Sequence, residues 1–216
     1  MKKKRILFLV CFIFVLLLLF IGLYYFNVIP HPSYNNAYFQ IETYKSSVDK
    51  DNDGIDDQTD ILNGVLEYIQ TKPKYQSKYY ETGYPNDNYG VCTDVVAMGL
   101  LNAGYDLMEL VYEDILESGN IYHIEQVDKR IDFRRVRNLE VYFKNHSIFL
   151  TTDSKEITEW QGGDIVIFEN YIGIVSDKRN KNGVPFVIHH ANPYQIKYEE
   201  DILEYRNDVK GHYRVS

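Results

Sequence analysis

Apolar positions divide this chain into three zones. An unbroken apolar run fills residues 6–26, and apolar residues recur at helical spacing between residues 61 and 116. After Trp160 the period changes to short β-rich runs separated by turns: GGDIVIF, YIGIVSD, PFVIHHA and GHYRV. Helices first and strands afterwards, without βαβ alternation, predict an α+β fold with an antiparallel sheet.

The helical zone predicts separate elements. One helix follows residue 60 and ends at Pro73, and another runs from Cys92 to a stop at Gly104. Asp106 opens the next helix, and residues 134–146 form a shorter candidate.

The first apolar run predicts a membrane anchor. Residues 6–26 carry no charge, and about 20 apolar residues suffice to cross a bilayer as a helix. Large residues at 23–26 offer no cleavage site for a signal peptidase. The basic residues 2–5 should stay in the cytoplasm, which makes this a single-pass protein of the cell membrane with an extracellular C-terminal domain. The alternative is a secreted product that is cleaved after the run.

Four segments follow from this interpretation: a cytoplasmic tip and anchor (1–27), a stalk (28–48), an acidic loop (49–60) and a folded domain (61–216). Cys11 lies in the anchor and is expected to face lipid. The formal net charge is −8, and it becomes −12 once the basic cluster of the anchor is set aside. An acidic domain argues against a nucleic-acid partner.

The acidic loop DKDNDGIDDQTD has the spacing of calcium ligands. Alternate carboxylates can converge on one cation because the chain turns at Gly54. The pattern resembles the calcium repeats of thrombospondin type 3, and an acidic solvated linker is the alternative. The predicted ligands of a structural Ca²⁺ that braces the stalk are Asp49, Asp51, Asp53, Ile55, Asp57 and Asp60.

Cys92 is the cysteine that lies outside the anchor. Extracellular cysteines usually pair, yet this one has no partner in the domain. A free cysteine is often a small buried hydrophobe. At the first turn of a helix, however, the backbone dipole favours the thiolate, which makes Cys92 a candidate nucleophile.

Several motifs in order resemble the bacterial family called domain of unknown function 1287: YGVCTDVV, VDKRIDFRRVRNL, WQGGDIVIF, IGIVSDKRNKNGVPFVIHH and GHYR. That family is remotely similar to NlpC-like cell-wall cysteine peptidases, which have a papain-like fold. The resemblance implies a nucleophilic cysteine at a helix start, packed on an antiparallel sheet. Cys92 matches this role, and His189 matches the polar residue that orients the catalytic histidine. The flank differs, because the peptidases usually have DCSG where this chain has VCTD.

The base position departs from the family pattern. HIGIVSD is expected, and this chain has YIGIVSD, so Tyr171 stands where the catalytic histidine should be. A phenol titrates near pH 10 and does not form a thiolate–imidazolium pair at neutral pH. Either another histidine is the base, or the domain has kept the fold and lost the catalytic activity. His189 and His190 point to opposite faces of a strand, and His189 is preferred for a dyad with Cys92.

The function predicted from the sequence is a membrane-anchored cysteine amidase or peptidase acting on peptidoglycan stem peptides. Its chemistry would be acyl transfer, with Cys92 attacking an amide and His189 moving the proton. An inactive cell-wall-binding module of the same fold is the second hypothesis, and a calcium-dependent adhesion protein is the third. His212 is expected to pack structurally with Tyr213 at the sheet edge. Arg134, Arg135 and Arg137 could hold a peptide carboxylate, but pairing with Asp128 or Asp132 is the preferred interpretation.

Overall fold

The computed structural model describes residues 2–215, which divide into two units at residue 32. In the first unit, α1 (Lys2–Tyr25) exposes large apolar side chains along its length. Its C-terminal end is closed by a fold-back in which the N–H groups of Val28 and Ile29 donate to the carbonyl of Leu23. Within the described residues, one helix is long and apolar enough to cross a membrane, as the sequence predicts.

The second unit contains the predicted helices. α3 begins at Cys92, and Asp106 caps α4 by accepting from the N–H groups of Met108 and Glu109. The short α5 was not predicted. The α-helices of this unit are α2 (Asp57–Gln70), α3 (Cys92–Asn102), α4 (Leu107–Ser118), α5 (Lys129–Asp132) and α6 (Val136–His146).

The strands form a six-stranded sheet in the order β3-β8-β4-β5-β6-β7, and each neighbouring pair is antiparallel. This confirms the α+β class. A separate parallel pair joins β1 (Lys74–Tyr75) to β2 (Tyr89–Gly90), just before α3. The main strands are β3 (Ile148–Phe149), β4 (Ile165–Phe168), β5 (Ile172–Arg179), β6 (Pro185–Ile188), β7 (Glu199–Glu200) and β8 (Val209–Arg214).

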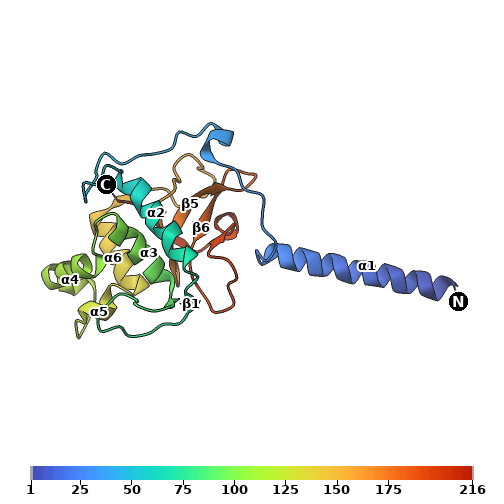
Figure 1. Ribbon diagram of the computed structural model, residues 1–216, viewed down its shortest axis with the longest axis horizontal. Helices are drawn as coiled ribbons and strands as arrows, with labels where there is room; N and C mark the ends of the chain where they lie inside the picture. Colours follow the sequence, from blue (N-terminus) through green and yellow to red (C-terminus); the bar gives the residue numbers. More distant parts are fainter. Residues whose placement is uncertain (1, 216) are drawn as a thin grey trace. The chain divides into compact units, whose positions relative to one another are not determined.

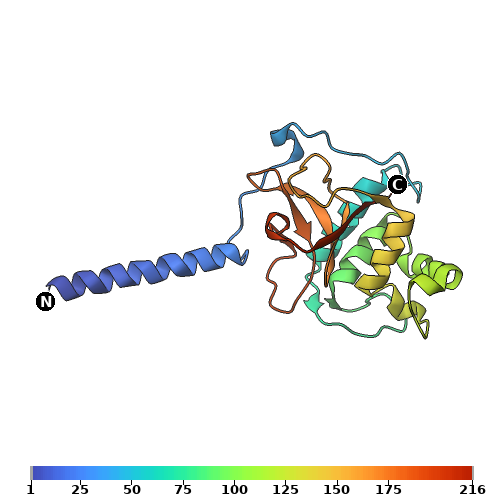
Figure 2. The same cartoon turned by 180° about the vertical axis from the view of Figure 1, so that it is seen from behind.

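Each face of the sheet carries its own core. Helices α3, α4 and α6 gather on one side of β5 and β6, as both views show (Figures 1 and 2). There Val95 and Leu100 of α3 cluster with Ile172 and Ile188. The other face is covered by loops and buries Trp160, Phe168, Val175, Val187 and Leu203. Alternation along β5 and β6 therefore decides which core a side chain joins.

A buried ionic network explains the GGD and GHYR motifs. The carboxylate of Asp164 accepts from the Arg214 guanidinium at 2.7 Å and from Gln58 at 2.9 Å, and it lies 2.9 Å from His212 Nε2. His212 also stacks on Trp160 with ring centroids 3.7 Å apart. The structural role predicted for His212 is confirmed. Its predicted place at the sheet edge is wrong, because β8 lies between β3 and β4.

The predicted stalk differs from the structure. Residues 33–56, here called the strap, lie along the domain: Tyr34 and Arg179 exchange backbone hydrogen bonds of 2.8 Å, and Asn36 donates to Gln161 at 3.0 Å. Buried Arg179 also donates to the carbonyl of Gly183 at 2.7 Å. From residue 33 the segment belongs to the folded unit because buried polar partners hold it there.

Candidate functional site

The start of α3 is held rigidly around Cys92. The Val91 N–H donates to Asp94 Oδ2 at 2.8 Å, which closes the first turn. Asp94 is fully buried and accepts two bonds from Arg134, at 2.7 and 2.9 Å. Arg134 thus pairs with Asp94 and not with Asp128 or Asp132, whereas the predicted pairing is present for Arg135, whose Nε lies 3.7 Å from Asp132 Oδ1. Arg134 neutralises the buried carboxylate two residues along α3 from the thiol.

Cys92 itself is half-buried, and its side chain packs against the helix-side core. Burial raises the pKa of the Cys92 thiol above its usual range. The backbone N–H groups of Ile172 and Thr93 act in the opposite direction, and the charge of Asp94 raises this pKa further. At neutral pH the sulfur is therefore a thiol that faces backbone donors from both α3 and β5.

Tyr171 precedes β5, next to the residue whose N–H faces Cys92. Its ring stacks on Phe168 at 4.5 Å and on His189 at 5.4 Å between centroids. Burial raises the pKa of Tyr171 to about 12; Arg206 lowers it, and Cys92 is among the groups that raise it. Gly173 allows β5 to lie close to the end of β6, because a Cβ on Gly173 would lie 2.7 Å from Val187 and 3.2 Å from His189.

His189 is oriented by a carboxylate. Its Nε2 lies 3.0 Å from Glu200 Oε2, and Glu200 is on the neighbouring β7. Because an ionised carboxylate only accepts, Nε2 carries the proton and Nδ1 keeps a free lone pair. That Nδ1 is buried and has no hydrogen-bond partner among the described residues. Gln195 fixes the same turn by donating to the His189 carbonyl at 2.9 Å.

His190 lies on the other flank of the site. It is buried, and its ring meets Tyr75 at 5.3 Å and Tyr198 at 5.0 Å. Burial and the neighbouring His189 lower the pKa of His190 to about 4, so its imidazole is neutral at physiological pH. Its Nδ1 also has no partner among the described residues. Tyr75 connects this flank to the thiol, since burial and then the charge of Cys92 raise the pKa of Tyr75.

The structure thus brings some predicted residues together and leaves others apart. Tyr171 and His189 are stacked, and the charge of an ionised Cys92 raises the pKa of both Tyr171 and Tyr75. Among the described residues no histidine forms a hydrogen bond to the Cys92 sulfur. Sequence reasoning missed Glu200 and Tyr75, because only the pairing of β6 with β7 and of β1 with β2 places them here.

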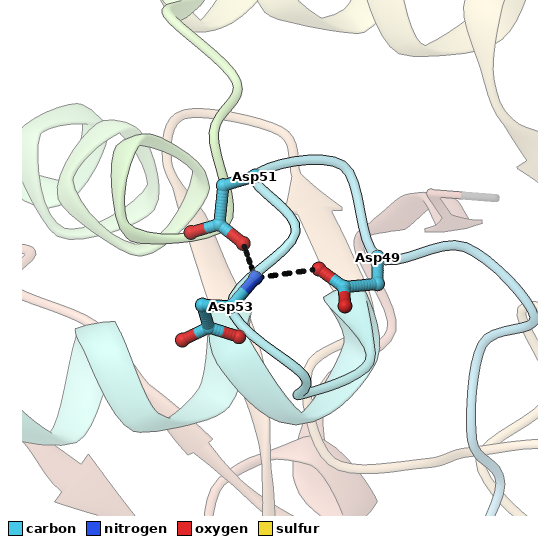
Figure 3. Close-up of side chains that lie close together, drawn as sticks. All are labelled: Asp49, Asp51 and Asp53. Carbon is cyan, nitrogen blue, oxygen red and sulfur yellow. Dashed lines mark hydrogen bonds between the residues drawn. The ribbon is translucent and has the colours of Figure 1, made fainter.

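The acidic loop is a second candidate site (Figure 3). Carboxylate oxygens of Asp49, Asp51 and Asp53 lie within 4.8 Å of one another. The Asp53 N–H donates to Asp49 Oδ1 at 3.2 Å and to Asp51 Oδ1 at 3.3 Å, and the Gly54 N–H donates to Asp49 Oδ2 at 2.9 Å. Asp53 in turn accepts from the Ile55 N–H at 2.8 Å.

The last two predicted ligands lie in the first turn of α2. Asp57 accepts from the Lys50 N–H at 2.8 Å and from the Tyr105 hydroxyl, so its two oxygens already serve to dock the loop. Asp60 is 2% exposed, and its Oδ2 has no hydrogen-bond partner among the described residues. Burial and the charges of Asp53, Asp51, Asp49 and Asp57 raise the pKa of Asp60 to about 6.

Fold and site together define an α+β protein with a cysteine at the first residue of a core helix and a histidine–carboxylate pair on the sheet. The chain matches the family model described as Domain of unknown function (DUF1287) over residues 62–215. It belongs to that family.

One relative is the "Uncharacterized protein YijF" of Escherichia coli (strain K12). The two are 35% identical over 167 residues, which cover 71% of this chain and 80% of the relative. No solved structure matches this chain. The strap, with the three clustered aspartates, lies before the part that the family model covers.

Proposed function

We propose that this protein is a membrane-anchored cysteine amidase or peptidase with a papain-like arrangement, acting outside the cell on peptidoglycan stem peptides. One observation carries the proposal: the Cys92 thiol begins a core helix, faces backbone N–H groups, and by its charge raises the pKa of Tyr171, which stacks on an imidazole oriented by Glu200. A cysteine that only fills space needs none of these groups.

The reaction is acyl transfer. Cys92 Sγ attacks the amide carbonyl carbon, and the thiol proton passes to the free Nδ1 of His189. The C–N bond breaks as this proton reaches the leaving amine, which leaves a thioester on Cys92. Water then hydrolyses the thioester to a carboxylate and restores the thiol. Backbone N–H groups at the start of α3 would hold the oxyanion during both steps.

Tyr171 sets the pH dependence of this chemistry. With a phenol where an imidazole is expected, nothing at position 171 promotes ionisation of Cys92 near neutral pH. The raised pKa of Cys92 means that its thiolate fraction, and with it the rate, increases toward alkaline pH. We therefore expect slow turnover at pH 7 and faster turnover above about pH 9.

The same observation favours a second function, a cell-wall-binding module that has kept the fold without the chemistry. A protonated thiol and a tyrosine in the base position suit such a module. The two functions differ in what Cys92 contributes, because a hydrolase needs the sulfur and a binding module does not.

The deciding experiment measures amide cleavage of purified muropeptides by the detergent-solubilised full chain, by mass spectrometry, at pH 7 and pH 9. We expect cleavage that rises with pH and falls to background in Cys92→Ala. A Cys11→Ala variant is the matched control and should retain full activity. Binding of muropeptides with no cleavage at either pH, unchanged in Cys92→Ala, would support the binding module instead.

A further inference from the structure

The acidic loop combines two features that a solvated linker does not need. Asp49, Asp51 and Asp53 crowd their carboxylates within 4.8 Å, although repulsion between like charges should separate exposed side chains. In the first turn of α2, where the charges of these carboxylates reach it, Asp60 is 2% exposed with an oxygen that has no hydrogen-bond partner among the described residues. Burying an unpaired carboxylate is costly, and a cation is the partner that removes the cost.

The loop is built on a rigid platform at the corner between α3 and α4. Gly104, with φ of +77°, lets the loop come close, since a Cβ there would lie 3.1 Å from Asp51 Cβ. The Tyr105 hydroxyl donates to Asp57, and Lys50 Nζ lies 4.7 Å from the centroid of the Tyr105 ring. The carboxylates are therefore held in place by contacts outside the loop.

We propose that Asp49, Asp51, Asp53 and Asp60, with the main-chain carbonyl of Ile55, form a calcium site that fastens the strap to the α3–α4 corner. Carboxylate and carbonyl oxygens at these positions suit Ca²⁺, which accepts six to eight oxygen donors in irregular geometry, better than Mg²⁺, which demands an octahedron. Asp57 is a positioning residue, because its oxygens hold Lys50 and Tyr105. Four ligating carboxylates on a surface loop indicate the weak affinity of extracellular modules, with a Kd of about 10⁻⁴ to 10⁻³ M.

Calcium should act on the strap as well as on the loop. Residues 33–56 connect to the rest of the domain through the Tyr34–Arg179 backbone pair, through hydrogen bonds to Gln161, and through the acidic loop. A cation that joins the strap to the first turn of α2 closes the connection at the acidic loop. Release of Ca²⁺ should therefore loosen residues 44–56 while α3 and the sheet stay folded.

The experiment uses the full chain in detergent, with CaCl₂ as the probe at constant ionic strength, and measures both calorimetric binding and the melting temperature. We expect one Ca²⁺ per chain and a melting temperature that is higher in 5 mM CaCl₂, about 5 to 50 times the expected Kd, than in chelator. Asp51→Asn should weaken binding at least tenfold. Glu117→Gln, an exposed change on α4, is the matched control and should leave both readouts unchanged.

Asp60→Asn should affect the melting temperature differently without and with calcium. Without calcium it removes an unpaired buried charge, so the variant should melt above the wild type. In calcium it lacks a ligand, so the gain from Ca²⁺ should disappear. The proposal is overturned by a wild-type melting temperature that ignores CaCl₂, or by an equal gain from MgCl₂, which would indicate charge screening alone.

Discussion

Two groups of buried histidines in this protein differ in how their nitrogens are used. His212 is fully buried and uses both ring nitrogens, with Thr151 O at 2.8 Å and Asp164 Oδ2 at 2.9 Å. His189 and His190 are almost as buried, yet each leaves Nδ1 without a partner among the described residues. A native fold normally satisfies its buried polar atoms. The first arrangement is typical of structure, and the second indicates a site that awaits another group.

The largest change should come from restoring an imidazole at position 171. Tyr171→His places a base with a pKa near 6.5 against His189, at the position where the family pattern has the catalytic histidine, and general base catalysis contributes about 10² to 10⁴-fold in rate. We expect muropeptide cleavage at pH 7 to increase by that factor. Cys92→Ala in the same background should abolish it. Equal rates for wild type and Tyr171→His would mean that another group is a sufficient base.

The next largest effect should come from disrupting the buried hydrogen-bond network around Asp164. Asp164→Ala leaves Arg214 and His212 buried without their shared carboxylate, and removing one partner of a buried pair costs about 3 to 5 kcal/mol. Denaturant unfolding should show a loss of this size. Asp177→Ala, at an exposed position of β5, is the control and should stay within about 0.5 kcal/mol of wild type. Near-normal stability of Asp164→Ala would refute the structural role of the network.

A smaller effect follows from the titration of His190. Its pKa is about 4 in the folded protein, against about 6.5 when unfolded, so folding disfavours the charged imidazole. The associated stability is complete above pH 6.5 and is lost as pH falls toward 4, by up to about 3 kcal/mol. His190→Gln should therefore lose less stability than wild type over this range in denaturant titrations. Parallel losses in the two proteins would contradict the buried neutral state.

Local sequence pattern predicts the elements of this fold better than the contacts between them. Helical spacing from Ile61 and the β-rich runs after Trp160 place α2 and the core strands, because burial repeats with the period of each element. Local pattern also predicts that Cys92 lies at the start of a helix. It does not predict the contact between Glu200 and His189, because that contact depends on the register between β6 and β7. Local pattern does not predict that the strap docks on the domain, because the residues that hold it, Gln161 and Arg179, lie more than 100 residues away in sequence.

Tyr171 occupies the base position for Cys92 in the proposed mechanism, and the alkylation rate of Cys92 as a function of pH tests this most directly. The measurement uses iodoacetamide on the Cys11→Ala background, with and without Tyr171→His, from about pH 5.5 to 9.5. Because burial raises the pKa of Cys92, the Tyr171 protein should react appreciably only above about pH 8.5. The Tyr171→His protein should already react fast near pH 6. Superimposed profiles would show that residue 171 does not control the thiol and would contradict the account.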